Sequence, residues 1–401
     1  MSQSPLAQYT GRYFLNRMVP RDPNEHGRAA SMLELFFDLV FVVAILFAGS
    51  ELHHALTHGH VMAGVLNYAL VMFYIWWAWM NFTWFASSFD TDDWLYRLLV
   101  IIQMSGVLVI AGNMHTIFDG DPVPGLIGYL IMRFAQVLQW LRASRTPGST
   151  RKTALIYTAG ITLVQAGWAV MSLNHIQWLI PVLILAELSV PVIAERAGGT
   201  PWHGHHLSER YGLLGLIVMG ESLRAAALAF QEASQTPDAA LALYGVGAMA
   251  IAISAGMWWI YFWPPHHHSI NQSNFWGTLR YGYLHYFIFA TIAAFAAGVE
   301  VISDTIAHKN HVGEAYAGLS LSIPVGLFIL AVWFVVIRDY APMAINLAMP
   351  AVGLVTMVQG FLPFSMIAVA MTVTLLVATL VMYRPLDYNR SHAKAEARLE
   401  P

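Results

Sequence analysis

Long apolar stretches follow one another along most of the chain and are separated by short polar links. Each stretch suits an α-helix that crosses a hydrocarbon core of about 30 Å, which takes about 20 residues. The pattern predicts about twelve such helices, and about ten is the alternative number because two links are very short. The predicted helices lie near residues 32–56, 61–85, 95–113, 123–142, 153–173, 176–195, 208–231, 239–263, 278–300, 315–337, 343–360 and 362–383.

The first predicted helix carries two carboxylates inside an otherwise apolar stretch. Glu34 and Asp38 are four residues apart, so on a helix they lie on one face, one turn from each other. A charged side chain in hydrocarbon costs about 3 kcal/mol or several times more. These two carboxylates therefore need an interior position, a partner or a functional role.

The composition is that of a chain embedded in lipid. It is 57% hydrophobic and only 11% charged, whereas soluble domains are about a quarter charged. The chain has no cysteine, which excludes disulfides, thiolate metal sites and cysteine nucleophiles. It has no basic patch with interleaved aromatic residues, so no nucleic-acid partner is expected. We therefore expect an all-α, polytopic transmembrane bundle in contact with membrane lipid.

The positions of lysine and arginine predict the orientation. Cytoplasmic links carry more of these residues than outer links do. With the N-terminus inside, the outer links contain only Lys309. The inner links and tails contain Arg142, Arg145, Arg151, Lys152, Arg196, Arg210, Arg280, Arg338, Arg384, Arg390, Lys394 and Arg398. Residues 1–31 form a basic, partly disordered tail without the apolar core of a signal peptide, so both termini are expected in the cytoplasm.

The two halves of the chain share a series of landmarks. Each half has a carboxylate, a tryptophan pair and an arginine, namely Glu34, Trp76-Trp77 and Arg97, then Glu209, Trp258-Trp259 and Arg280. Six helices in each half would form a parallel repeat, although tryptophan and arginine are also common at membrane edges. The predicted organisation is a tail at 1–31, repeats at 32–200 and 201–383, and a cytoplasmic tail at 384–401.

Four motifs are similar to those of a known family. They are Glu-Leu-Phe-Phe-Asp-Leu-Val-Phe-Val at 34–42, His-Leu-Ser-Glu-Arg-Tyr-Gly at 206–212 with Gly-Glu-Ser at 220–222, Trp-Trp-Ile-Tyr-Phe at 258–262 and Gly-Val-Glu at 298–300. In this order they resemble the signatures of the bacterial low temperature requirement A (LtrA) family. The acidic residue expected after the third motif is Trp263 here, and the chain beyond residue 300 matches only by hydropathy.

The resemblance implies a bacterial inner-membrane protein with many spans, from a family named for a growth phenotype in the cold. It brings no biochemical activity with it. Phe36-Phe37-Asp38 is also similar to the Phe-Ser-Asp motif of a potassium-channel family that has two repeats of six helices. This second likeness favours a path for a cation through the protein.

Glu34 and Asp38 have two interpretations. The functional one is a cation or proton site near the inner leaflet, since carboxylate oxygens bind hard cations and intramembrane carboxylates relay protons. The structural one is an ion pair with Arg210 or Arg28, or the capping of a helix N-terminus. Glu34 lies in the first turn, which favours the structural role. Asp38 lies one turn deeper, which favours the functional role.

A second set of charges lies on the seventh predicted helix. Glu221 and Arg224 are three residues apart, so they can form an ion pair within the helix. Alternatively, Glu221 lines the same path as Asp38 and Arg224 sets its protonation. Glu209 and Arg210, near the start of this helix, are secondary candidates.

Other interior polar residues have similar alternatives. Arg133 and Glu187 are expected to pair with each other, either to fix helix register or to serve transport. His285 is either a satisfied interior histidine or a member of a proton relay. Glu300 at an outer helix end is expected to be solvated. The histidines of the links, His203, His205 and His206 among them, lack a fixed ligand spacing, so no metal site is predicted.

Sequence motifs of enzymes are absent, since the chain has no phosphate loop, zinc motif, nucleophile elbow or dinucleotide fingerprint. The hypothesis is a protein that moves a small cation or proton, without a cofactor. In this hypothesis Asp38, Glu34 and Glu221 bind the ion, and Arg224 and His285 tune them. The alternatives are a non-transporting scaffold or sensor linked to growth at low temperature, and an integral-membrane lipid-modifying enzyme. The oligomeric state and the transported species are not predicted.

Overall fold

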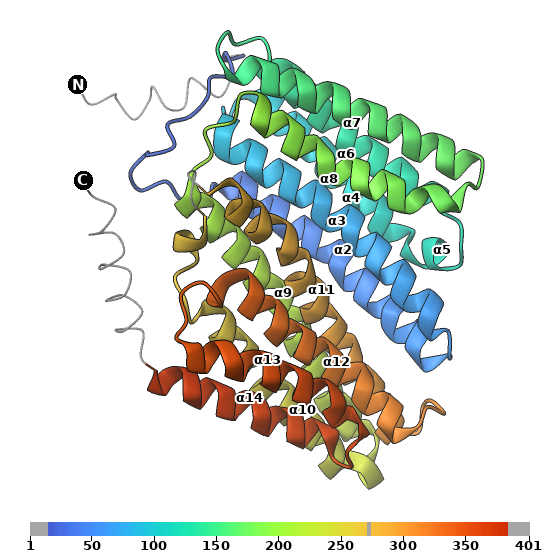
Figure 1. Ribbon diagram of the computed structural model, residues 1–401. Helices are drawn as coiled ribbons and strands as arrows, with labels where there is room; N and C mark the ends of the chain where they lie inside the picture. Colours follow the sequence, from blue (N-terminus) through green and yellow to red (C-terminus); the bar gives the residue numbers. More distant parts are fainter. Residues whose placement is uncertain (1–14, 271–273, 384–401) are drawn as a thin grey trace. The chain divides into compact units, whose positions relative to one another are not determined.

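A computed structural model of the chain describes residues 15–270 and 274–383, and these residues form helices joined by short links (Figure 1). The long helices are α2 (Met32–Thr57), α3 (Val61–Phe89), α4 (Trp94–Gly112), α6 (Val123–Ala143), α7 (Thr150–Leu173), α8 (Ile180–Ala197), α9 (Gly204–Gln235), α10 (Ala240–Phe262), α11 (Phe275–Ile306), α12 (Glu314–Val332), α13 (Met343–Val358) and α14 (Ser365–Met382). The shorter ones are α5 (Met114–Phe118), η1 (Gln177–Leu179), η2 (Pro237–Ala239), η3 (His266–Ser269), η4 (Trp333–Ile337) and η5 (Gln359–Phe361). The predicted tail at 384–401 lies outside the described residues.

The all-α, polytopic fold predicted from the sequence is confirmed, because a long helix lies at each predicted position. Among the described residues, eleven segments are long and apolar enough to cross a membrane. The predicted segment that does not meet this criterion is α6, whose apolar character is reduced by Arg133, Gln136 and Gln139. The exact number of membrane crossings therefore stays a prediction.

Contacts divide the chain into two units. Unit 1 comprises the residues up to Phe47 together with Phe73–Arg210, and unit 2 comprises Ala48–Met72 and the residues from Tyr211 onward. The boundaries fall inside α2, α3 and α9, so they differ from the predicted halves at 32–200 and 201–383. An internal repeat stays a prediction.

In unit 1, neighbouring helices pack in chain order, α4 against α6, α6 against α7 and α7 against α8 (Figure 1). Glycines bring the backbones of α4 and α6 into contact. A Cβ atom on Gly106 would lie 2.6 Å from the carbonyl oxygen of Gly128, so a larger residue would push these helices apart. Farther along α6, Gln139 accepts a hydrogen bond from Gln103 of α4 over 3.0 Å.

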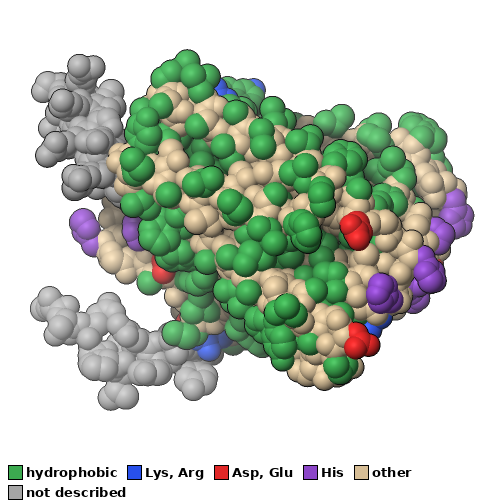
Figure 2. Space-filling view, turned by 90° about the horizontal axis from the view of Figure 1, so that it is seen from below, with side chains coloured by type: hydrophobic (Ala, Val, Ile, Leu, Met, Phe, Trp, Pro, Cys, Tyr) green, Lys and Arg blue, Asp and Glu red, His purple; other side chains and the backbone are tan. Residues whose placement is uncertain are grey.

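In unit 2, α12 packs between α11 and α13, and α10 packs against α14. Large apolar side chains of α13 and α14 are exposed, among them Leu347, Leu354, Met371 and Leu375. Figure 2 shows hydrophobic side chains spread over one face of the molecule, with few charged ones. Such apolar surface fits contact with lipid hydrocarbon.

Residues 15–31 follow a defined course on unit 1 before α2 begins. Arg142 donates to the carbonyl oxygen of Asn16 over 2.6 Å, and Thr146 donates to that of Met18 over 2.5 Å. The backbone N–H of Arg21 donates to the carbonyl oxygen of Ser88 over 2.9 Å. The sequence predicted a partly disordered tail here. Residues 1–14 of that tail lie outside the described residues, and the rest is held by specific hydrogen bonds.

Candidate functional site

The first turn of α2 fixes the position of Glu34. Ser31 precedes the helix, and its Oγ accepts a hydrogen bond from the Glu34 N–H over 3.3 Å. The Glu34 carboxylate in turn accepts from the Ser31 N–H over 2.8 Å. This reciprocal arrangement is a capping box, which satisfies two backbone donors at a helix start. The structural role expected for Glu34 is therefore present, and it also holds the carboxylate in one place.

The start of α9 is fixed in a similar way. The backbone N–H of His206 donates to the ring Nδ1 of His203 over 3.1 Å, so the His203 side chain caps this helix. The other ring nitrogen of His203 donates to the carbonyl oxygen of Glu25 over 3.0 Å, because a carbonyl can only accept. His206 and Arg210 are four residues apart on α9 and lie on one face.

These two helix starts bring four charged or titratable side chains together in unit 1. Arg210 donates to Glu34 over 2.7 Å, and through two nitrogens to Asp38 over 2.6 and 3.1 Å. The indole N–H of Trp79, on α3, also donates to Asp38 over 2.6 Å. The Nε2 of His206 lies 3.2 Å from the Glu34 carboxylate. We call these five residues the Glu34–Arg210 cluster.

The Glu34–Arg210 cluster is sealed from solvent and unbalanced in charge. Glu34 is 2% exposed, and Asp38, His206 and Arg210 are 0% exposed. Among the residues of the cluster, two carboxylates face one guanidinium, so the cluster itself carries one negative charge when both carboxylates are ionised and His206 is neutral. The buried guanidinium of Arg28, outside the cluster, also acts on Glu34. A buried charge is costly unless it is compensated.

His206 is the group of the cluster that titrates nearest to neutral pH in ordinary surroundings. Its Nδ1 has no hydrogen-bond partner among the described residues. Its Nε2 contacts a carboxylate that also binds a guanidinium. The pair of Glu34 and His206 can thus share a proton without any movement of Arg210.

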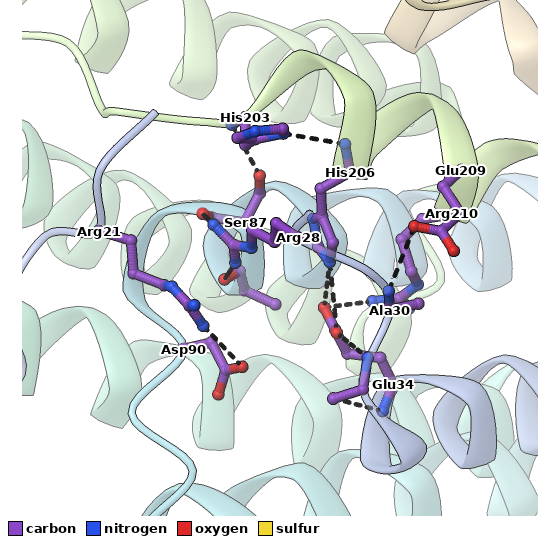
Figure 3. Close-up of polar contacts among 12 residues, drawn as sticks. Arg21, Arg28, Ala30, Glu34, Ser87, Asp90, His203, His206, Glu209 and Arg210 are labelled. Atoms are coloured by element: carbon purple, nitrogen blue, oxygen red, sulfur yellow. Dashed lines mark hydrogen bonds and ion pairs between the residues drawn. The ribbon is translucent and has the colours of Figure 1, made fainter. Parts of the chain in front are cut away.

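The segment before α2 contacts α3 and α9 through Arg28 and Ala30 (Figure 3). Arg28 donates to the carbonyl oxygens of Ala86 and Ser87 at the end of α3, and the Ala30 N–H donates to Glu209 over 3.2 Å. A guanidinium is favoured at a helix C-terminus because it complements the helix dipole. This segment therefore contacts the end of α3 and the start of α9, two of the helices that supply the cluster.

Asp90 lies in the link after α3, where Arg21 donates to its carboxylate over 3.4 Å (Figure 3). Burial, together with Glu34 and Asp92, raises the pKa of Asp90 to about 6, although Arg21 and Arg28 lower it. This carboxyl group is therefore a second titratable group of unit 1 that changes charge at mildly acidic pH.

Comparison with known proteins assigns the chain to a family. The family model described as bacterial low temperature requirement A protein (LtrA) matches residues 29–383, which include both helix starts and the whole cluster. The chain belongs to the LtrA family. It is also similar to an uncharacterized protein of Rhizobium meliloti (strain 1021), with 27% identity over 260 residues. The matched part spans 60% of this chain and 60% of that protein.

This LtrA family member has a second buried cluster in unit 1, around Glu187 on α8. The Glu187 carboxylate accepts from Trp77, Tyr129, Arg133 and Gln165 over distances of 2.7–2.9 Å. An ionised carboxylate has about four acceptor positions, so these donors fill them. The expected pairing of Arg133 with Glu187 is found, and the contacts are those of a fixed structural node.

In unit 2, a chain of ion pairs links α9, α11 and α2. Arg224 pairs with Glu221 over 2.5 Å and with Glu300 over 2.6 Å. His53 lies 4.0 Å from Glu300 and 2.8 Å from Asp304. The expected pairing of Glu221 and Arg224 is found, whereas the expectation that Glu300 is solvated is wrong. Arg224 pairs with Glu221 of its own helix, α9, and also with Glu300 of α11. Glu300 is therefore part of this set of ion pairs.

His285 has all its ring hydrogen bonds satisfied inside unit 2. Its Nδ1 donates to the carbonyl oxygen of Tyr281 over 2.7 Å, and its Nε2 accepts from the Tyr261 hydroxyl over 3.1 Å. His266 has the reciprocal bonds, 3.0 Å to the Tyr281 hydroxyl and 2.6 Å to the Tyr261 carbonyl. We call these four residues the His–Tyr ring. Of the two alternatives for His285, these contacts match the satisfied interior histidine.

The structure thus brings Glu34, Asp38 and Arg210 together. It places Glu209 beside the cluster, on the N–H of Ala30. Glu221, Arg224 and His285 belong to unit 2, so a path that they share with Asp38 stays a prediction. Within the described residues, no three His, Asp or Glu side chains are grouped so that they could hold a metal ion.

Sequence reasoning missed Trp79 and His206. His206 had a usable signal, because its spacing of four from Arg210 places both on one helix face. The predicted helix began at 208, and this boundary left His206 in a link. Trp79 had no comparable signal, since its contact with Asp38 depends on how α3 is rotated.

Proposed function

We propose that this protein moves protons, or a small monovalent cation coupled to protons, across the membrane. The observation that carries the proposal is the leftover negative charge of the Glu34–Arg210 cluster at nearly complete burial. An intramembrane carboxylate with a histidine partner is an arrangement typical of proton relays. We propose a transporter rather than an enzyme.

Each residue of the cluster has a distinct role in this proposal. Glu34 and His206 carry the proton, since they contact each other over 3.2 Å. Arg210 orients Asp38 with two hydrogen bonds. Trp79 closes the cluster from the α3 side with a third bond to Asp38. Protonation of either Glu34 or His206 removes the charge imbalance, and its loss restores it.

Unit 2 offers a second set of carboxylates of the same type. Three carboxylates, Glu221, Glu300 and Asp304, face Arg224 and His53. Here too the carboxylates outnumber the guanidinium and a histidine contacts one of them. We propose that this set is the proton-loading site of unit 2, as the Glu34–His206 pair is that of unit 1.

The test is flux in proteoliposomes that contain a pH-sensitive dye, with imposed gradients of K⁺, Na⁺ and H⁺. We expect flux from the wild type, and flux at background level from Glu34→Gln, because the amide cannot take up a proton. His206→Gln should transport but lose the dependence of its rate on pH between about 5 and 8, since this is the range in which histidine titrates.

Glu195→Gln is the matched control. Glu195 lies on α8 of the same unit, but its carboxylate accepts from neutral groups, Tyr157 and Thr200, over 2.9–3.0 Å. The variant should keep the wild-type flux. Folding of each variant is checked by its melting temperature in detergent. Equal flux from Glu34→Gln and Glu195→Gln, with both folded, would contradict the proposal.

A second candidate function is a scaffold or sensor of the membrane. The observation that favours it is the set of three hydrogen bonds that Asp38 accepts from Arg210 and Trp79. In that case wild-type protein shows no flux under any gradient, and Asp38→Asn lowers the melting temperature as its main effect. The same experiment thus separates the two functions.

We propose the bacterial inner membrane as the location, with both termini in the cytoplasm. The excess of lysine and arginine in alternate links supports this orientation. A reporter enzyme that is active only outside the cytoplasm, fused after residue 401, should be inactive. The same reporter inserted beside Lys309 should be active.

A further inference from the structure

Polar side chains follow one ridge of α6 through the interior of unit 1. Arg133, Gln136, Gln139 and Arg142 succeed one another at intervals of three residues, so each neighbours the next one turn along. All four side chains are buried, although this helix packs among apolar helices. A stripe of this kind must find hydrogen-bond partners inside the unit.

Some atoms of the stripe find no such partner. Within the part of the chain that the structure describes, Arg133 Nε, Gln136 Nε2 and Gln139 Nε2 are buried and unpartnered. The amide of Gln136 cannot simply be turned around, because its oxygen accepts from Arg133 Nη1 over 2.8 Å. All three unpartnered atoms are N–H donors.

The amide of Gln139 leaves one atom unused in either orientation. Its oxygen accepts from the amide nitrogen of Gln103, on α4, over 3.0 Å. If oxygen and nitrogen were exchanged in both amides, Gln139 would donate to Gln103 instead. The oxygen of Gln139 would then have no hydrogen-bond partner among the described residues. Gln165 adds an unpartnered acceptor, since its nitrogen binds Glu187 and its oxygen has no partner among the described residues.

The charges along the stripe are already compensated. Arg133 pairs with Glu187 over 2.8 Å, and Arg142 pairs with Asp93. An anion would therefore meet no excess positive charge, and a cation would face donors. Water is neutral, accepts from N–H donors and donates to an amide oxygen, so it matches this set of atoms.

We propose that the unpartnered atoms of Arg133, Gln136, Gln139 and Gln165 bind a file of water molecules along α6. The file runs from Gln139 toward the Glu187 node, to which Arg133 and Gln165 donate. It gives unit 1 a hydrated interior that does not involve the Glu34–Arg210 cluster. The inference is independent of transport, because it concerns what the stripe binds in the resting protein.

The absence of cysteine makes the test direct. Single variants Gln136→Cys and Gln139→Cys in proteoliposomes are treated with a small, water-soluble methanethiosulfonate. The controls are Met104→Cys, which removes a buried side chain of similar size from α4, and Phe134→Cys on the exposed apolar face of α6. A thiol reacts as the thiolate and ionises poorly in apolar surroundings, so we expect the two glutamine positions to react at least about tenfold faster.

Equally slow reaction at all four positions, with each variant folded, would overturn the proposal. A second measurement avoids the cavity that a cysteine leaves. Gln103→Met combined with Gln139→Met removes a bonded pair at nearly constant volume. If water binds the pair, the melting temperature falls, whereas it rises if the donors are dry, because unsatisfied groups have then been removed. A rise would also overturn the proposal.

Discussion

The two units hold their acidic side chains among apolar helices in different ways. In unit 1, Glu34 and Asp38 share Arg210, and all three are at most 2% exposed. In unit 2, Glu221 and Glu300 share Arg224, whose side chain is 43% exposed. Each set consists of two carboxylates and one arginine. The comparison teaches that burial decides what an ion pair contributes, because desolvation raises both the strength of a pair and the cost of breaking it.

Replacing the arginine of each set should give the largest difference in stability between the two units. Arg210→Met leaves two buried carboxylates without a counter-charge, so we expect the free energy of unfolding to fall by about 3–5 kcal/mol. Arg224→Met should cost less, since the Arg224 side chain is 43% exposed whereas that of Arg210 is fully buried. Thermal unfolding in detergent measures both. Similar losses in the two variants would show that burial does not separate the units.

In unit 2, the dependence of folding stability on pH tests whether His266 is buried and neutral. Burial lowers the pKa of His266 to about 4, below its ordinary value of 6.5, although its bond to the Tyr261 carbonyl raises it. The neutral ring therefore stabilises the fold fully above pH 6.5, and this contribution is lost as the pH falls through 4. The loss amounts to about 3 kcal/mol.

The check on His266 is the difference in unfolding free energy between wild type and His266→Gln as a function of pH. Glutamine does not titrate, so the difference isolates the histidine. We expect the advantage of the wild type to shrink as the pH falls from about 7 to about 4. A difference that does not change with pH would rule out a buried, neutral His266.

The opposite sign is expected in unit 1. Burial raises the pKa of Asp90 from 3.8 to about 6, so its ionised form destabilises the fold above pH 6. Stability is gained as the pH falls through 6 and is fully present below 3.8, by about 3 kcal/mol in total. Asp90→Asn removes this dependence, and the same unfolding titration detects it. A wild type that gains nothing relative to Asp90→Asn on acidification would contradict the assignment.

The smallest expected difference concerns single hydrogen bonds. Trp79→Phe removes a donor from the charged Asp38, which costs about 1.5–3 kcal/mol. Tyr261→Phe removes a donor from the neutral His285, which costs about 1 kcal/mol. Melting temperatures of the two variants measure the order, and the reverse order would indicate that Asp38 is not ionised.

Much of this fold follows from the sequence, because hydrophobic length sets the positions of the helices. The pairs Arg133–Glu187 and Glu221–Arg224 also follow, since a charge in an apolar helix needs a nearby opposite charge. His206 was missed through a boundary error of four residues at the start of α9. Helix ends are set by capping groups such as His203, and a histidine is an unusual residue for that role.

The remaining contacts depend on features that residue types do not encode. Arg28 binds carbonyl oxygens of Ala86 and Ser87, and every residue has such an oxygen. Which of fourteen tryptophans reaches Asp38 depends on the rotation of α3. Contacts of this kind appear only when the helices are packed.

The His–Tyr ring has a consequence for how this sequence can change over generations. Replacing either histidine leaves one tyrosine hydroxyl without its partner, and replacing either tyrosine leaves one ring nitrogen without its partner. Each single step is therefore penalised, whereas exchanging a histidine together with its tyrosine partner for two apolar residues removes the stranded groups at once. We expect the pairs Tyr261 with His285 and Tyr281 with His266 to covary among relatives, and to persist or disappear as pairs during neutral drift.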